Sequence, residues 1–237
     1  MGNKTCIPFV QICFKHRFRF LFVSILVVIV MNPIIESIAP LRILFSIFIT
    51  AVIMSATYAL SQKMRHLIIG SILAVPALGF LWASDYSDST ALFLESHIAG
   101  VLFFVFVVVH ILIFIFGQER VSSDLIVGAA VAYLLMAVIW SYVYLIIETL
   151  QPGSFHIPDG QSLGSRYVFV YYSLVTISTL GYGDVTPLTS IAGSFSVLEA
   201  VIGQLYLVTM IAWLVGVHVS QSGRMGPCRD NWMDKSR

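Results

Sequence analysis

Residues 171–184 read Tyr-Tyr-Ser-Leu-Val-Thr-Ile-Ser-Thr-Leu-Gly-Tyr-Gly-Asp, and this stretch decides the fold. It lies between two apolar segments that each reach the roughly 20 residues needed to cross a bilayer as a helix. The helical part before the glycines, Tyr167 to Thr179, is too short to cross. Because non-helical backbone is tolerated at membrane depth only where protein shields it, we expect a re-entrant helix followed by a loop.

The Gly-Tyr-Gly run at residues 181–183 permits backbone conformations that other residues rarely adopt. Such conformations place several carbonyl groups on one side of the chain. Carbonyl oxygens that face a common axis replace the hydration shell of a cation, which is the principle of a selectivity filter. A lone Gly-Tyr-Gly is usually only a turn, so the prediction depends on its position between two membrane helices.

The rest of the chain has the composition of a membrane protein. Of its 237 residues, 58% are hydrophobic and 11% are charged, whereas soluble domains carry about a quarter charged residues. Apolar segments are expected at residues 20–35, 41–60, 67–82, 97–116, 122–150 and 188–219. The third is expected to be interrupted at Gly70, Pro76 and Gly79 and followed by an acidic loop with Asp85, Asp88 and Glu95, and residues 122–124 are expected to cap the fifth. We therefore predict an all-α polytopic membrane protein with six transmembrane helices, a re-entrant pore helix and a selectivity filter.

The basic residues predict the orientation of the chain. With a cytoplasmic N-terminus, eleven of the thirteen Lys and Arg residues lie in cytoplasmic segments, and only Arg42 and Arg166 lie outside. This bias is the one that orients membrane proteins, and six crossings return the chain to the same side. We expect a multi-pass protein of the plasma membrane, or of the inner membrane if bacterial, with both termini cytoplasmic.

The chain from about residue 122 to 219 resembles the tetrameric potassium-channel superfamily, through the motif Thr-Leu-Gly-Tyr-Gly-Asp at 179–184. Leu180 stands where Val or Ile is more usual, on a side chain that points away from the ions. The resemblance implies a filter that extends to Gly183, with K⁺ bound by the Thr179 hydroxyl and by four carbonyl groups. Those carbonyl groups belong to Thr179, Leu180, Gly181 and Tyr182. One filter per chain and no internal repeat imply a homotetramer.

The resemblance also assigns residues around the filter. Tyr171 and Tyr172 stand where family members carry aromatic side chains that brace the filter; the alternative is ordinary core or interface packing. Asp184 completes the motif and is assigned to filter support. Gly203 follows Gly183 by twenty residues, the spacing of the family's hinge glycine. Close helix packing is the alternative, since glycine is common in membrane helices.

The last apolar segment carries a candidate cavity face and one polar outlier. The cavity face, which could close as a hydrophobic constriction, comprises Gln204, Leu207, Ile211 and Val215. Glu199 lies near the membrane midplane, where an ionisable group is costly and usually functional. We hypothesise that Glu199 supports the filter from behind by bonding pore-helix hydroxyls such as Thr176 or Ser178. The alternative is a protonated carboxyl satisfied by the helix at 122–150.

The segment at 97–116 carries no arginine or lysine. Steep voltage gating needs several charges, because one elementary charge that crosses 100 mV supplies about 2.3 kcal/mol. We therefore expect no conventional voltage gating. The expected domains are a basic cytoplasmic N-terminus (1–19), a four-helix membrane domain (20–117), a pore domain (118–219) and a short cytoplasmic tail (220–237). The four-helix domain is either a degenerate sensor or an unrelated bundle.

These expectations combine into one function, passive conduction of K⁺ through a homotetrameric pore. The expected partners are other copies of the chain and membrane lipids, with no nucleic acid, no soluble substrate and no cofactor besides the permeant K⁺. Two alternatives remain: a weakly selective cation channel, and a membrane sensor or assembly subunit with a silent pore. An enzyme is not expected, because no membrane segment carries a paired acid and base or a metal-ligand cluster.

Overall fold

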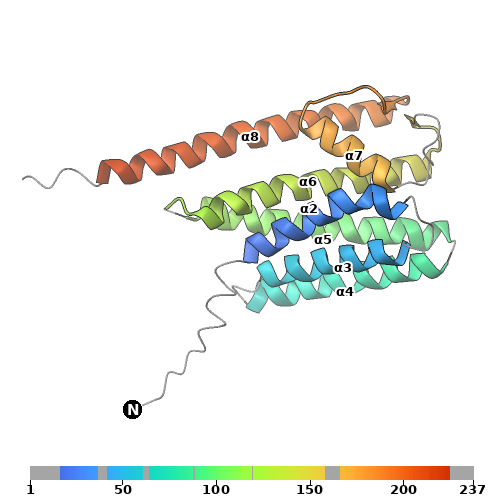
Figure 1. Ribbon diagram of the computed structural model, residues 1–237, viewed down its shortest axis with the longest axis horizontal. Helices are drawn as coiled ribbons and strands as arrows, with labels where there is room; N and C mark the ends of the chain where they lie inside the picture. The colour runs from blue at the N-terminus through green and yellow to red at the C-terminus, as the bar shows by residue number, and fades with distance from the viewer. Residues whose placement is uncertain are drawn as a thin grey trace, which may run out of the picture.

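The computed structural model describes residues 17–36, 42–60, 64–87, 89–118, 120–157 and 166–224. Most of the predicted N-terminal stretch and cytoplasmic tail therefore lies outside the described residues. The described chain is almost entirely helical (Figure 1). Its helices are α2 (Arg17–Glu36), α3 (Arg42–Ala59), α4 (Met64–Tyr86), α5 (Thr90–Phe116), α6 (Ser123–Leu150), α7 (Arg166–Ile177) and α8 (Ser190–Arg224). Two short strands, β1 (Phe155–His156) and β2 (Thr186–Pro187), pair antiparallel.

Within the described residues, four helices are long and apolar enough to cross a membrane: α4, α5, α6 and α8. Helices satisfy their own backbone hydrogen bonds, which is the condition for crossing lipid. The apolar parts of α2, α3 and α7 are shorter. The all-helical class predicted from the sequence is confirmed.

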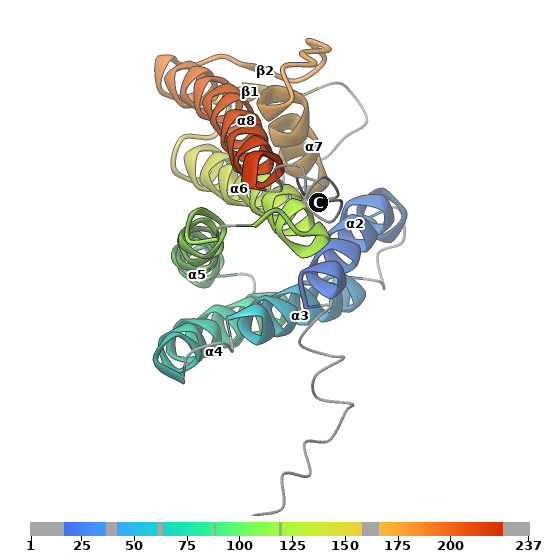
Figure 2. The same ribbon diagram turned by 90° about the vertical axis from the view of Figure 1, so that its left-hand side faces the viewer.

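The helices run side by side, with α8 and α3–α4 on opposite sides of α6 (Figure 1). The end-on view in Figure 2 shows α3 and α4 on the side remote from α7 and α8. Helix α5 packs against both α4 and α6, and α2 packs against α3, α6 and α7. The first four helices are therefore joined directly to the helices that carry the candidate filter.

Two boundaries differ from the prediction. The segment expected at 97–116 begins at Thr90, so Glu95 lies in α5 and not in an acidic loop. Helix α4 continues through Pro76, where an interruption was expected, and ends at Tyr86. Polar residues at the end of a helix reach the membrane surface, and neighbouring helices tolerate a proline in a membrane helix. Neither feature ends the helix here.

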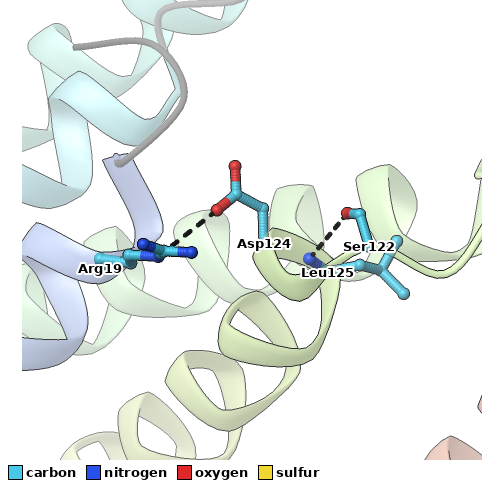
Figure 3. Close-up of polar contacts among 4 residues, drawn as sticks. All are labelled: Arg19, Ser122, Asp124 and Leu125. Atoms are coloured by element: carbon cyan, nitrogen blue, oxygen red, sulfur yellow. Dashed lines mark hydrogen bonds and ion pairs between the residues drawn. The ribbon is translucent and has the colours of Figure 1, made fainter. Parts of the chain in front are cut away.

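The start of α6 is fixed by two polar contacts (Figure 3). Ser122 is the N-cap: its hydroxyl oxygen accepts a hydrogen bond from the Leu125 amide at 3.3 Å, as the sequence predicted. Asp124 lies in the first turn, where the helix dipole favours a negative charge. Its carboxylate is 3.8 Å from the Arg19 guanidinium of α2. Because both side chains reach solvent, this pair contributes at most about 1 kcal/mol.

A glycine allows α5 to approach α6 closely. A Cβ atom at Gly100 would lie 2.4 Å from the Tyr142 ring. The same region contains fully buried rings of Phe103 and Phe104, and the His97 ring lies 5.0 Å from that of Tyr142. The contact between α5 and α6 is therefore tightly packed and leaves no room for an added methyl group.

We predict that Gly100→Ala destabilises the protein by about 1–3 kcal/mol, because the added methyl group overpacks the contact with Tyr142. Gly79→Ala is the matched control, since a Cβ atom there meets nothing within 4 Å. The measurement is the thermal unfolding midpoint of each purified variant in detergent. Equal midpoints for the two variants would contradict the packing described here.

Candidate functional site

The loop after α7, residues 178–184, is attached to the last turn of that helix. It contains the predicted filter and is called the filter loop below. The Val175 carbonyl accepts hydrogen bonds from the Leu180 amide at 2.9 Å and from the Gly181 amide at 3.4 Å. The Thr176 carbonyl accepts from the Thr179 amide at 2.9 Å. Any movement of α7 is therefore transmitted to the chain that follows it.

The backbone of this loop alternates in handedness. The φ angle is positive at Thr179 (58°), Gly181 (57°) and Gly183 (79°), whereas Leu180 and Tyr182 have no positive φ. A chain in which the sign of φ alternates suits carbonyl groups that face a common axis, the arrangement that a file of cations requires.

Thr179 is the feature of this loop that the sequence did not reveal. Among the described residues it is the only non-glycine residue with a positive φ. A β-branched residue in this conformation is strained, at a cost of about 1–3 kcal/mol, and such strain concentrates at functional sites. The need for glycine at 181 and 183, in contrast, followed from the sequence.

The outer end of the loop is held by Asp184. Its carboxylate accepts hydrogen bonds from the Tyr171 hydroxyl at 2.7 Å and from the Val185 amide at 3.0 Å. The bond from Tyr171 is the main reason that the pKa of Asp184 lies below its ordinary value. The Tyr171 ring also lies nearly parallel to that of Tyr182, with centroids 6.4 Å apart. The structure thus brings together Tyr171 and Asp184, both predicted to support the filter.

A second carboxylate organises the loop after α6, and the sequence analysis missed it. Glu148 is buried, and its two oxygens accept hydrogen bonds from the amides of Gly153 (2.7 Å) and Phe155 (3.2 Å). Phe155 then pairs with Pro187 in the β1–β2 sheet. This chain of contacts connects the end of α6 to the segment between the filter loop and α8.

Tyr172 faces away from the loop. Its side chain is buried beside Tyr144 and Phe155, and its hydroxyl lies 2.7 Å from the Ser196 hydroxyl of α8. It therefore connects α7 to α8 and belongs to the packing that supports the helix. This arrangement corresponds to the core packing considered for Tyr172, and support of a filter stays a prediction.

The inner end of α7 lies against α8 at Gly203. A Cβ atom there would lie 2.5 Å from Ile177 Cγ1 and 2.8 Å from the Ile177 carbonyl oxygen. The same carbonyl accepts a hydrogen bond from the Tyr133 hydroxyl of α6 at 2.9 Å. Helix α8 is continuous through Gly203. The geometry gives Gly203 a packing role, and a hinge role stays a prediction.

The predicted cavity face is largely free of contacts within the subunit. Gln204, Ile211 and Val215 are exposed, and Leu207 is half-buried. The Gln204 amide reaches the Thr179 hydroxyl at 3.5 Å, the outer limit for a hydrogen bond. This face therefore begins directly below the filter loop.

Glu199 contacts α7, but not at the hydroxyls hypothesised, and it also contacts α6, the helix named in the alternative. Its side chain is 0% exposed, and its carboxyl group is hydrogen-bonded to the hydroxyls of Tyr144 and Ser173. The expected partner Ser178 instead donates to the Leu174 carbonyl of its own helix at 2.6 Å. The crossing of α8 over α7 places Glu199 at Ser173, three residues before Thr176 and five before Ser178.

Residues 125–218 match a family model described as "Ion channel". The match supports an ion channel. It covers nearly all of α6, the filter loop with α7, and most of α8, whereas α2–α5 lie outside it. No curated protein and no solved structure matches the chain. The residues of the loop, of Tyr171 and Asp184, and of Glu199 and Gly203 therefore all lie within the matched segment.

We predict that Tyr171→Phe lowers stability at neutral pH by no more than about 1 kcal/mol, because the lost bond is exposed. Tyr171 depresses the Asp184 pKa below its ordinary value of 3.8. The stabilisation is therefore complete above pH 3.8 and is lost as the pH falls through the lower pKa of the folded protein. Thermal unfolding at pH 7 and pH 3 measures the difference between variant and wild type.

In an Asp184→Asn background, the effect of Tyr171→Phe is expected to be independent of pH. A difference between Tyr171→Phe and wild type that is the same at both pH values would contradict the assigned role of the Asp184 carboxylate.

We also predict that Gly203→Ala lowers ion flux in proteoliposomes at least tenfold, because the methyl group must displace the backbone at Ile177. Gly216→Ala on the same helix is the control, since its Cβ atom meets nothing within 4 Å. Equal flux through the two variants would show that α8 does not position the end of α7.

Proposed function

We propose that this protein is a potassium-selective channel that conducts K⁺ passively through a homotetrameric pore. One observation carries the proposal, the alternating backbone of residues 179–183 at the end of a helix too short to cross the membrane. Potassium channels are the known example of carbonyl groups that replace the hydration shell of an ion. The K⁺ ligands would be the carbonyl groups of residues 179–182 and the Thr179 hydroxyl.

The direction of α7 also favours a cation at the filter. Its C-terminal end leads into the filter loop, and the helix dipole places a partial negative charge of about −0.5 there. Four such ends around one axis would lower the energy of a cation below the filter. The exposed cavity residues Ile211 and Val215 would surround the path further in, where a hydrophobic ring closes by dewetting.

The exposure of the loop supports assembly from several copies. In one subunit Leu180 is 56% and Tyr182 66% exposed, and the loop between them has no secondary structure. Such backbone does not face lipid, so at membrane depth it needs protein or water around it. A ring of identical copies around the filter would surround the loop with protein and with a water-filled path. We propose that the ring has four copies. The apolar residues exposed on α8, such as Leu205 and Val208, would then contact neighbouring copies.

The remaining helices support six crossings with both termini in the cytoplasm. Helix α2 has 20 residues, a length of about 30 Å, and it lies beside α6. Together, α2 and α3 would raise the number of crossings from four to six. The re-entrant segment that contains α7 would return to the side from which it enters, so it adds no crossing. Helix α5 contains no lysine or arginine, so we propose that α2–α5 brace the pore and that the channel is not gated conventionally by voltage.

The test is a reversal potential of the purified protein in a planar bilayer, with K⁺ on one side and Na⁺ on the other. We expect reversal near the K⁺ equilibrium potential, with a conductance that changes little over a voltage ramp. Reversal near zero would overturn selectivity in favour of a weakly selective channel. The absence of current from correctly assembled protein at every pH tested would overturn conduction itself.

A matched pair of variants assigns the selectivity to the loop. Gly183 and Gly153 both have a positive φ, 79° and 84°, and a Cβ atom at either meets nothing within 4 Å. The strain of an alanine is therefore similar at the two sites. We expect Gly183→Ala to abolish K⁺ selectivity and Gly153→Ala to preserve it. Loss of selectivity in both variants, or in neither, would contradict the assignment.

A further inference from the structure

Glu199 is an acidic residue in the middle of a membrane helix, completely buried within one subunit. Three helices meet at its carboxyl group. One oxygen contacts the Tyr144 hydroxyl of α6, and the other contacts the Ser173 hydroxyl of α7. The Ser173 hydroxyl also lies 2.8 Å from the Ala137 carbonyl oxygen of α6.

The number of protons in this network determines the state of Glu199. Three oxygen–oxygen contacts connect Glu199, Tyr144, Ser173 and the Ala137 carbonyl, and each needs one proton. The two hydroxyl groups supply two protons, and a carbonyl group supplies none. If Glu199 carries the third, it donates to Ser173, Ser173 donates to Ala137, and Tyr144 donates to the other carboxyl oxygen. Every contact then has one donor and one acceptor.

Among the described residues, no opposite charge around Glu199 favours the ionised form. The titratable side chains that face it are the tyrosines Tyr133 and Tyr144 from α6 and Tyr172 from α7. None of these is a cation. A buried carboxylate without a cation is strongly disfavoured, and a group in such a position neutralises instead. The surroundings of Glu199 and the proton count therefore both indicate a protonated, neutral carboxyl group.

We propose that Glu199 carries a proton in the folded protein and, in this neutral form, is a positioning residue that holds pore helix α7 between α6 and α8. The transport consequences rest on the proposed channel function, whereas the protonation does not. The carboxyl group touches neither the ion path nor the filter backbone, so it acts on conduction only through α7.

The connection from Glu199 to the filter passes along one face of two helices. Glu199 and Gly203 are four residues apart and so lie on the same face of α8. Glu199 bonds Ser173 in the body of α7, and Gly203 packs against Ile177 at its end. The residue between these two points, Val175, accepts the amides of the filter loop. This two-point contact fixes the depth and the rotation of α7. Through Val175, it also fixes the position of the filter loop.

Replacement of Glu199 by glutamine tests the neutral state by transport. The glutamine amide donates to Ser173 and its carbonyl accepts from Tyr144, as a protonated carboxyl group does. We expect Glu199→Gln to keep the K⁺-over-Na⁺ permeability ratio within twofold of wild type. Glu199→Ala is expected to lower the ratio at least fivefold or to accelerate the decay of current at constant voltage.

Either of two results would overturn the positioning role. Glu199→Gln that behaves like Glu199→Ala would show that the network needs a carboxylate, and Glu199→Ala that behaves like wild type would show that α7 does not depend on it. Glu199→Asp adds a second comparison, because it keeps the acid but is one methylene shorter. It is expected to resemble the alanine variant.

Infrared difference spectroscopy tests the proton directly and needs no conduction. The spectrum of wild type minus Glu199→Gln at pH 7 should contain the carbonyl stretch of a protonated carboxylic acid. Asp184→Asn is the control: the hydrogen bond from Tyr171 holds the pKa of Asp184 below its ordinary value, so Asp184 should contribute only carboxylate bands at pH 7. A carboxylate signal from Glu199 would overturn the proposal while leaving the proposed channel function intact. A channel that fails to select K⁺ would leave the infrared result valid.

Discussion

The constraint on which this structure depends is the hydrogen-bonding need of the backbone in a medium without water. Helices that cross the membrane meet it alone, but residues 178–184 do not, because they have left α7 and form no strand with a neighbour. The amides of residues 178–181 return to carbonyl groups of α7, at Leu174, Val175 and Thr176. In the proposed channel, the carbonyl groups of residues 179–182 bind a dehydrated cation.

A helix of twelve residues that carries such a loop has to be held by others. Helices α6 and α8 contact α7 at several points along its length. Tyr171 and Asp184 fix the outer end of the loop, Glu199 binds Ser173 in the body of the helix, and Gly203 packs against its inner end. These contacts all lie within one chain, so in the proposed tetramer each copy would contribute a filter segment that is already positioned. The first four helices extend this support, since α5 and α2 both pack on α6.

The sequence predicted those parts that follow from local chemistry. Long apolar runs gave the helices, Ser122 gave the start of α6, and glycines at 181 and 183 gave the positions that need left-handed backbone. It did not predict what depends on which helix faces meet. Glu199 was assigned to Thr176 or Ser178 because no local sequence pattern gives the angle at which α8 crosses α7. Glu148 was missed because its amide partners belong to a loop. The positive φ of Thr179 opposes the preference of its own side chain, so only the structure reveals it.

The most direct test of the proposed filter is a structure of the assembled protein determined in K⁺ and again with Na⁺ in its place. We predict four copies around one axis, with density for a file of K⁺ ions between the carbonyl groups of residues 179–182. In Na⁺ this file is expected to change or empty. Carbonyl groups of these residues that face protein or lipid, away from a shared axis, would contradict the proposed filter.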